Sequence, residues 1–279
     1  MSKMDQPRAP SRIKKRAENG RTGQTGTAFA IIDRIPSCGH SPTKGTWGGA
    51  RNDGKKPSWH LSLENCLDLI EAGDLAEAIG LRFNRHWIVH YAKAGIDEHD
   101  AMRFIGRLLK LAGDYARRHG GRLAAIWVRE GGPGKGGHVH ILMHLSTGLS
   151  LRGRSRRWIG LAGGRCVHKV SRVRPVAGII GAAEGDSEHY RHNVGNVRRY
   201  LLKNVDVASG RDLGLKHKGQ SGLIVGKRCG WTQNIGKSER SNRKRRTESA
   251  TQIQIPILLE SARSEFLQTN ARGRARAYI

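Results

Sequence analysis

The sequence predicts an α+β fold, and three observations lead to that prediction. Along residues 81–205, segments rich in β-branched and aromatic residues alternate with segments whose apolar residues recur at helical spacing. Two of the strand segments are separated by a short glycine-rich turn, which is the pattern of an antiparallel hairpin. One of them is apolar on a single face, as expected of a strand whose sheet is covered by helices on that face.

The elements of this module follow one another at short intervals. In order they are a strand at 85–92, a helix from Asp97 to the stop at Gly120–Gly121, strands at 123–130 and 138–145 joined by the turn GGPGKGG, and a helix at 193–205. Residues 146–175 are rich in arginine, but their apolar residues show little period, so no element is predicted there.

The segments on either side of the module differ from it in composition. Residues 1–60 are rich in Gly, Pro, Ser, Thr and Lys and predict a flexible basic extension. Residues 61–80 predict a lead-in helix, with Ser62 as its N-cap and Glu64 in a first turn that favours negative charge. Residues 206–279, rich in Gly and Lys, predict a basic and partly disordered C-terminal region. The chemistry is therefore expected in the module between these segments.

The charge of the chain indicates an anionic partner. Its 50 Lys and Arg against 23 Asp and Glu give a formal net charge of +27, which is unfavourable in a folded chain without counter-charges. The 81–205 module alone holds 23 Lys and Arg and 8 Asp and Glu, so the excess lies where the chemistry is expected. No apolar run approaches the length of a membrane span. Nucleic acid is therefore the predicted partner, and a membrane is not.

The cysteines and the first residues of the chain indicate a reducing cytoplasm. Cys38, Cys66, Cys166 and Cys229 form no Cys-x-x-Cys pair, which argues against a structural zinc site and against a disulfide framework. The opening segment MSKMDQPRAPSRIKK lacks the apolar core of a signal peptide. We therefore expect a cytoplasmic protein.

Two histidines on the third strand are candidate metal ligands. Side chains alternate along a strand, so His138 and His140 lie on one face, about 7 Å apart. The opposite face carries Val139, Ile141, Met143 and Leu145. Glu130 ends the preceding strand, and hairpin pairing would bring its carboxylate beside the imidazoles. Two imidazoles and a carboxylate suit a divalent ion, Mg²⁺ or Mn²⁺. The alternative is a pair of half-buried histidines that are hydrogen-bonded to the backbone.

The last predicted helix carries a candidate nucleophile. Its packing stripe consists of Val197, Leu201 and Val205. Asn196, Tyr200 and Lys203 form a separate stripe, so the phenol shares its surface with a cation one turn further on. A phenol beside an ammonium and a divalent cation ionises more readily, and phenolate is a nucleophile toward phosphorus. The alternative is that Tyr200 is an amphipathic residue at the edge of the core.

Arginine-rich segments are candidate contacts for a nucleic-acid strand. The stretch RGRSRRW combines guanidinium groups, which bind phosphates, with an indole on which an unstacked base can stack. Two further arginines directly precede Tyr200 on its helix. The residues predicted to bind DNA are Arg152, Arg154, Arg156, Arg157, Trp158, Arg198 and Arg199. The alternative for RGRSRRW is a solvated loop.

Taken in order, three motifs resemble those of the HUH endonuclease superfamily. They are NRHWIVHY on the first strand, GGHVHILMHL on the third strand and YLLK on the last helix. Their order and spacing are similar to those of the rolling-circle replication initiators of bacterial plasmids and small phages, and the resemblance covers residues 81–205. It implies a catalytic domain there, with a central antiparallel sheet and helices on one face, of ferredoxin-like or RNA-recognition-motif type.

The resemblance also implies an activity. His138, His140 and Glu130 would bind the metal, and Tyr200 would attack a phosphate of single-stranded or hairpin DNA at a replication origin. The product would be a 5′-phosphotyrosyl enzyme and a free 3′-hydroxyl that primes synthesis, and the same site would rejoin the strand.

The chain departs from parts of the family pattern. Asn196 stands four residues before Tyr200, where phage-type initiators often have a second tyrosine, so a single-tyrosine enzyme is expected. The phosphate loop GxxxxGK[ST] does not occur in the sequence, so a host helicase would unwind the duplex and a host polymerase would extend the primer. Two alternatives stay open: a single-tyrosine HUH transposase, and a nucleic-acid-binding protein without enzymatic activity.

Overall fold

The structure, a computed structural model, describes residues 56–132, 134–215 and 222–246. Most of the predicted N-terminal extension and the end of the predicted C-terminal region lie outside these residues. No helix within the described ranges combines the length and the apolar character that a membrane span needs.

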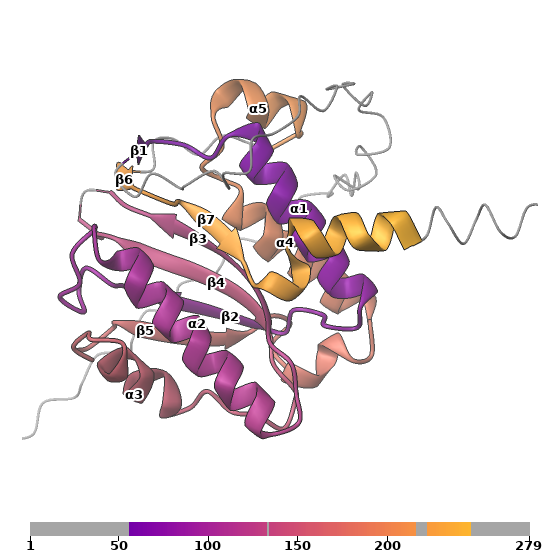
Figure 1. The fold of residues 1–279 in the computed structure, drawn as a ribbon, viewed down its shortest axis with the longest axis horizontal. Helices are drawn as coiled ribbons and strands as arrows, with labels where there is room; N and C mark the ends of the chain where they lie inside the picture. Colours follow the sequence, from indigo (N-terminus) through magenta and orange to yellow (C-terminus); the bar gives the residue numbers. More distant parts are fainter. Residues whose placement is uncertain (1–55, 133, 216–221, 247–279) are drawn as a thin grey trace, which may run out of the picture. The chain divides into compact units, whose positions relative to one another are not determined.

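The central element of the fold is a five-stranded antiparallel sheet with the strand order β5-β2-β4-β3-β7 (Figure 1). The strands are β2 (Arg85–Val89), β3 (Ala124–Glu130), β4 (His138–His144), β5 (Ser171–Pro175) and β7 (Cys229–Trp231). Helix α2 (Ala101–Arg118) connects β2 to β3, and α3 (Arg154–Leu161) connects β4 to β5. Without β7, this β-α-β-β-α-β chain with its all-antiparallel order is the ferredoxin-like arrangement. The predicted α+β class with a central antiparallel sheet is confirmed.

One face of the sheet packs against α2 and α3 to form the main hydrophobic core. Helix α2 crosses this face in front of the strands (Figure 1). The predicted apolar face of β4 and its extension lies wholly in this core, which contains Val139, Ile141, Met143 and Leu145. The helices contribute Phe104, Ile105, Leu108 and Ala112 from α2, and Trp158 and Ile159 from α3. Alternation along a single strand therefore fixes which face is buried under the helices.

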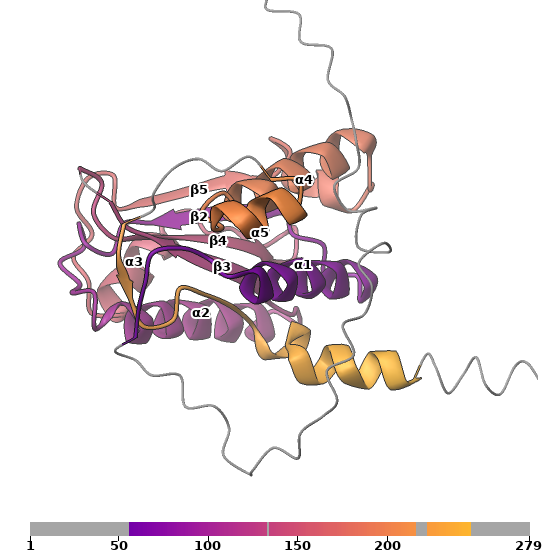
Figure 2. The same cartoon turned by 90° about the horizontal axis from the view of Figure 1, so that it is seen from above.

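The opposite face of the sheet is partly covered as well, by α1 (Leu63–Ala78) and α4 (Glu188–Leu201). Helix α1 begins at the predicted N-cap, where the Ser62 side chain accepts a hydrogen bond from the Asn65 amide. It contacts β3 and β7, and α4 contacts β4. Figure 2 shows α4, with α5 (Val207–Asp212), on the side of the sheet away from α2. The sequence predicts both helices, at 61–80 and at 193–205, but it predicts helices on one face of the sheet only, and α1 and α4 lie on the other face.

Arg198 fixes α4 to α1. Its guanidinium donates a hydrogen bond of 2.7 Å to the Ile70 carbonyl oxygen and forms an ion pair of 2.5 Å with Asp74. Gly73 leaves the room for this contact, because a Cβ there would lie 2.7 Å from the guanidinium nitrogen Nη2. Arg198 is buried and engaged in these bonds. It was predicted to bind DNA, and that prediction is wrong because its buried guanidinium already pairs with Asp74 and bonds to α1.

The hairpin between β3 and β4 places two ligand candidates directly opposite each other. Glu130, the last residue of β3, pairs with His138, the first residue of β4. The turn packs closely against the end of β2, where a Cβ at Gly137 would collide with the ring of Tyr91. Glycine at this position therefore lets the turn approach β2.

Short elements account for the structure that the sequence did not predict. Both α3 and β5 lie in 146–175, where arginines interrupt the apolar period. The two-residue strands β1 (Pro57–Ser58) and β6 (Ile224–Val225) pair with each other, and β7 adds to the edge of β3. Residues 237–246 are helical. The folded unit thus extends beyond the boundary predicted at 205, because strands of two or three residues carry no readable alternation.

Candidate metal centre and nucleophile

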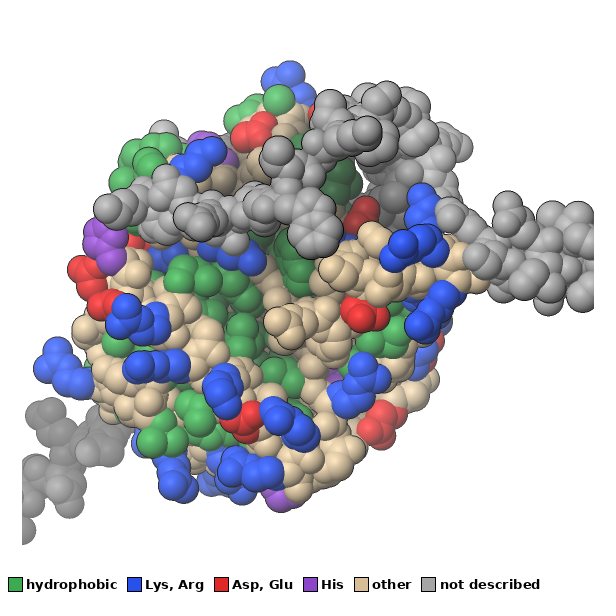
Figure 3. All heavy atoms as spheres, in the orientation of Figure 1, with side chains coloured by type: hydrophobic (Ala, Val, Ile, Leu, Met, Phe, Trp, Pro, Cys, Tyr) green, Lys and Arg blue, Asp and Glu red, His purple; other side chains and the backbone are tan. Residues whose placement is uncertain are grey.

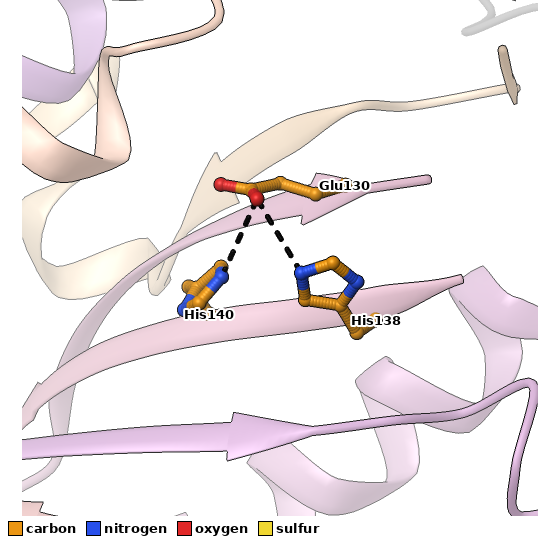
Figure 4. Close-up of side chains that lie close together, drawn as sticks. All are labelled: Glu130, His138 and His140. Atoms are coloured by element: carbon orange, nitrogen blue, oxygen red, sulfur yellow. Dashed lines mark ion pairs between the residues drawn. The ribbon is translucent and has the colours of Figure 1, made fainter. Parts of the chain in front are cut away.

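Glu130, His138 and His140 form a compact group on the face of the sheet opposite to α2. Figure 4 shows the carboxylate of Glu130 on β3 directed at both imidazoles of β4. Oε2 of Glu130 lies 3.4 Å from Nε2 of His138 and 3.5 Å from Nε2 of His140. All three side chains are buried. The predicted convergence of these residues is confirmed.

Hydrogen bonds on the far side of each ring aim the two imidazoles at the same point. Nδ1 of His138 lies 3.1 Å from the Gly136 carbonyl oxygen. Nδ1 of His140 lies 3.1 Å from Nε2 of His86. Both rings therefore turn their Nε2 atoms toward Glu130, and partners of this kind are what hold metal-binding histidines in one tautomer and orientation.

The group has the ligand atoms of a metal site, and two of its buried polar atoms lack a hydrogen bond. One ligand atom from each residue lies within 4.8 Å of the others, so the group can hold a metal ion. Oε1 of Glu130 and Nε2 of His140 are buried and lack a hydrogen-bond partner among the described residues. Buried polar atoms are usually satisfied, so two atoms left without a hydrogen bond in one small group indicate a missing ligand. A divalent cation would satisfy both.

Positive charge surrounds the carboxylate. Burial alone would raise the pKa of Glu130, but its contacts with the imidazoles of His138 and His140 and the nearby charge of Lys203 hold that pKa below its ordinary range. Nζ of Lys203 lies 2.7 Å from Oε2 of Glu130. The carboxyl is therefore ionised and ready to act as a ligand at neutral pH.

Two further histidines without a predicted role extend the cluster: His86 on β2 and His90 directly after that strand. Burial, together with the charges of His140, Arg174 and Lys203, lowers the pKa of His86 to about 3. The ring of His90 stacks on that of His138 at 5.0 Å between centroids, and burial lowers the pKa of His90 to about 4. Both rings are thus neutral at pH 7 and add no positive charge. Their i, i+4 spacing, which puts both on one face of an extended segment, is the signal that could have identified them.

Tyr200, at the end of α4, lies over the metal group, which consists of Glu130, His138 and His140. Its ring lies edge-on to that of His140, with 5.1 Å between centroids, and 6.4 Å from that of His86. Nζ of Lys203 lies 3.5 Å from the Tyr200 ring centroid, so one ammonium contacts both the phenol and Glu130. Tyr200 is 40 % exposed, so a large substrate can reach it.

The other tyrosine of α4 is placed differently. Tyr190 is buried, and its hydroxyl donates a hydrogen bond of 2.8 Å to the Phe83 carbonyl oxygen. Burial raises the pKa of Tyr190 above its ordinary range. It is a packing residue, which leaves Tyr200 as the phenol of this helix that faces both the metal group and solvent.

The remaining residues predicted to bind DNA do not form one surface with the metal group. Helix α3 buries its apolar side in the core that α2 shares, so the stretch RGRSRRW lies on that side of the sheet. Its arginines are exposed: Arg152, Arg154, Arg156 and Arg157. Figure 3 shows Lys and Arg side chains spread over the face that carries α2, with few acidic ones between them. Arg199, on α4, is half-buried and bonded to the Asn196 side chain.

Trp158 is not available to a nucleic-acid base. The side chain is 5 % exposed and packs on Trp87 and Tyr115, with ring centroids 6.2 Å and 5.6 Å away. The prediction that it stacks on an unpaired base is wrong. Helical spacing places this indole on the inner side of α3 and its neighbouring arginines on the outer side.

Comparisons with protein-family models, with curated proteins and with solved structures find no match for this chain.

Proposed function

We propose that this protein nicks and rejoins single-stranded DNA through a covalent bond to Tyr200, with the help of a divalent cation held by Glu130, His138 and His140. The observation that carries the proposal is the position of Tyr200. It is an exposed phenol at the end of a helix, with its ring 5.1 Å from the buried imidazole of His140, whose Nε2 faces the Glu130 carboxylate at 3.5 Å. A structural polar cluster has no need of an exposed phenol beside it.

The covalent step is an exchange of one phosphodiester for another. The Tyr200 hydroxyl oxygen attacks the phosphorus of the scissile phosphate, and the bond from phosphorus to the 3′-oxygen breaks. The hydroxyl loses its proton, and the departing 3′-oxygen gains one. A 5′-phosphotyrosyl linkage and a free 3′-hydroxyl result, and attack by that hydroxyl reverses the step. No bond energy is lost, so cutting and rejoining stay balanced.

The residues around the phosphate have separate tasks. A cation on Glu130, His138 and His140 would supply Lewis-acid polarisation of a phosphate oxygen, and Mg²⁺ or Mn²⁺ fits the mixed nitrogen and oxygen donors. His86 and the Gly136 carbonyl hold the imidazoles in position. Lys203, which contacts both the Tyr200 ring and Glu130, holds the phenol beside the carboxylate and places a positive charge near the scissile phosphate.

Initiation of rolling-circle replication at a plasmid or phage origin is the role that the order of the motifs favours. In that role a free 3′-hydroxyl would prime a host polymerase after a host helicase opens the duplex. The same chemistry would serve a transposase, and the two differ in the DNA that they cut.

Detection of a covalent protein–DNA adduct tests the proposal. The full chain is incubated with Mn²⁺ and with single-stranded and hairpin oligonucleotides that tile the DNA around its gene, and adducts are detected by denaturing gel and mass spectrometry. We expect an adduct on Tyr200 that Tyr200→Phe abolishes and that chelation of the metal prevents.

Tyr190→Phe is the matched control, because it removes one hydroxyl from the same helix. It loses a buried hydrogen bond of about 1 kcal/mol and should keep the adduct. An adduct that survives Tyr200→Phe and disappears in Tyr190→Phe would place the nucleophile at Tyr190. A wild-type chain that binds the oligonucleotides and forms no adduct with any of them would make it a binding protein and overturn the proposal.

A further inference from the structure

We propose that Arg172 and Arg174 of β5 bind consecutive phosphates of the single strand that reaches Tyr200, and that this strand leaves the site over the β5 edge toward Arg152 and Arg156. The inference rests on the proposed function and adds the path of the substrate. Arg172 and Arg174 had no predicted role, whereas Arg152 and Arg156 were predicted to bind DNA.

The sheet register puts both β5 arginines on the face that carries the metal group. Arg174 pairs with His86 of β2, and Arg172 pairs with Ile88. Ile88 pairs in turn with His140. Directly paired residues point to the same face, so Arg172, Ile88 and His140 form one row across three strands.

These two guanidinium groups are free to take an anion. Arg172 and Arg174 are both exposed, whereas the alternating residues of β5 are half-buried. Among the described residues, neither guanidinium takes part in an ion pair or a hydrogen bond. Two like charges about 7 Å apart on one strand repel each other. A bound polyanion removes that repulsion and gives each guanidinium an acceptor.

The path continues around the edge of the sheet. β5 is an edge strand, and beyond it Arg152 and Arg156 line a hollow of about 370 Å³ together with Ser171 and Val173 of β5. Their side chains too are exposed and without an ion-pair or hydrogen-bond partner in the part of the chain that the structure describes. Cationic groups therefore run from the metal group, across β5, to the beginning of α3.

Protection of an edge strand is the competing explanation. Charged residues on an edge prevent two sheets from joining, and arginines would serve that purpose on either face. Such a role needs no particular face and no relation to Tyr200. The two explanations differ in what removal of the charges does to DNA binding, to adduct formation and to self-association.

Equilibrium binding of single strands in the Tyr200→Phe background tests the proposal, because this variant binds without cutting. The probes are oligothymidylates of about 6 and about 16 nucleotides, so that only the longer one can span both parts of the path. Arg172→Gln/Arg174→Gln should weaken binding of both probes and reduce the salt slope by about 1.4, which is 0.7 for each lost phosphate contact. Arg152→Gln/Arg156→Gln should weaken binding of the longer probe only.

Arg118→Gln/Arg122→Gln is the control, since it removes the same charge from exposed positions at the other end of β3, about 26 Å along the strand direction from Glu130. If Arg172→Gln/Arg174→Gln changes affinity and salt slope no more than this control does, the path is wrong. If that variant instead oligomerises while binding DNA normally, edge protection is the role of these arginines. Failure of the proposed function would appear separately, as a wild-type chain that forms no Tyr200 adduct although the arginine variants weaken binding.

Discussion

The two faces of the central sheet are made by the same strands and hold opposite kinds of chemistry. On β4, Val139 and Ile141 point into the core under α2, while His138 and His140 point to the opposite face and form the metal group with Glu130. The hydrophobic cluster on the core face consists of apolar side chains and the phenols of Tyr91 and Tyr115. The two buried arginines of that face, Arg85 and Arg129, lie at or near strand ends, where Arg85 bonds to the Leu149 carbonyl oxygen and Arg129 pairs with Glu98. The site face gathers a carboxylate, four imidazoles and an ammonium within a few ångströms.

This contrast indicates how stability and function are divided. Dispersion and burial on the core face hold the sheet together. Charges on the site face are paired with each other, as Glu130 is with Lys203, and such buried pairs contribute little net stability. Neighbouring residues of one strand should therefore have separable effects, with function lost on one face and stability lost on the other.

The largest expected effect is on the site face. His140→Ala removes a ligand and should reduce Mn²⁺ binding and adduct formation below detection, with little change in thermal stability. Isothermal titration with Mn²⁺, the adduct assay and thermal unfolding measure the three properties. His144→Ala is the control, because His144 lies on the same strand and face but is bonded to the Arg82 carbonyl oxygen. Equal loss of Mn²⁺ binding in both variants would show that the site is not where the geometry puts it.

A substitution one residue further along β4 should lower stability and leave Mn²⁺ binding intact. Ile141→Ala opens a cavity in a fully buried position and should lower the free energy of unfolding by about 2–5 kcal/mol. The fraction that stays folded should bind Mn²⁺ as the wild type does. Chemical denaturation measures the first effect and titration at a temperature well below the midpoint measures the second. A stable Ile141→Ala variant that loses Mn²⁺ binding would break the division between the faces.

The support of the site should produce an intermediate effect. His86→Ala removes the hydrogen bond to Nδ1 of His140 and should weaken Mn²⁺ binding by about 10- to 100-fold. His86→Gln keeps a polar group within reach of the same nitrogen and should restore most of the affinity. If alanine and glutamine weaken binding equally, the ring of His86 acts by packing and not by orienting His140.

Strand alternation is why much of the site could be predicted from sequence. It placed His138 and His140 on one face, and hairpin pairing added Glu130. Helical spacing separated Tyr200 from the apolar stripe of its helix. These are local rules, and they work because each element presents its faces independently of what packs on them.

The errors concern tertiary packing. Nothing local to α4 shows that α1 lies against it, so Arg198 looked like a surface cation when it is bonded to Ile70 and Asp74. Helix α3 has only eight residues, and its arginines conceal the stripe that buries Trp158. Strand β7 is too short for its alternation to be read, and β5 has a single β-branched residue among Ser, Arg and Pro. Their places in the sheet depend on partners far away in the sequence.

The smallest effect distinguishes the two faces by their response to acid. The core cluster contains no histidine, whereas burial lowers the pKa of His86, His90, His140 and His144 on the site face. The unfolded chain binds protons on these imidazoles below pH about 6.5, and the folded chain does so only at lower pH. Stability is therefore complete above that pH and falls as the pH drops through the window between the unfolded and folded pKa values. The slope is at most about 1.4 kcal/mol per pH unit for each histidine.

His144 gives the cleanest test of this response, since it is not a candidate ligand. Burial lowers its pKa, although the hydrogen bond to the Arg82 carbonyl oxygen opposes the shift. With the metal chelated, the free energy of unfolding is measured by denaturant between pH 7 and pH 5, where carboxylates stay ionised. We expect His144→Gln to reduce the slope of the free energy of unfolding against pH by an amount equivalent to less than one proton. Ile141→Val on the core face should lower the free energy of unfolding equally at every pH and leave that slope unchanged. If the free energy of unfolding of the wild type does not change over this range, these imidazoles titrate alike in the folded and unfolded chain. Burial would then not lower their pKa values, and the expected response to acid would be wrong.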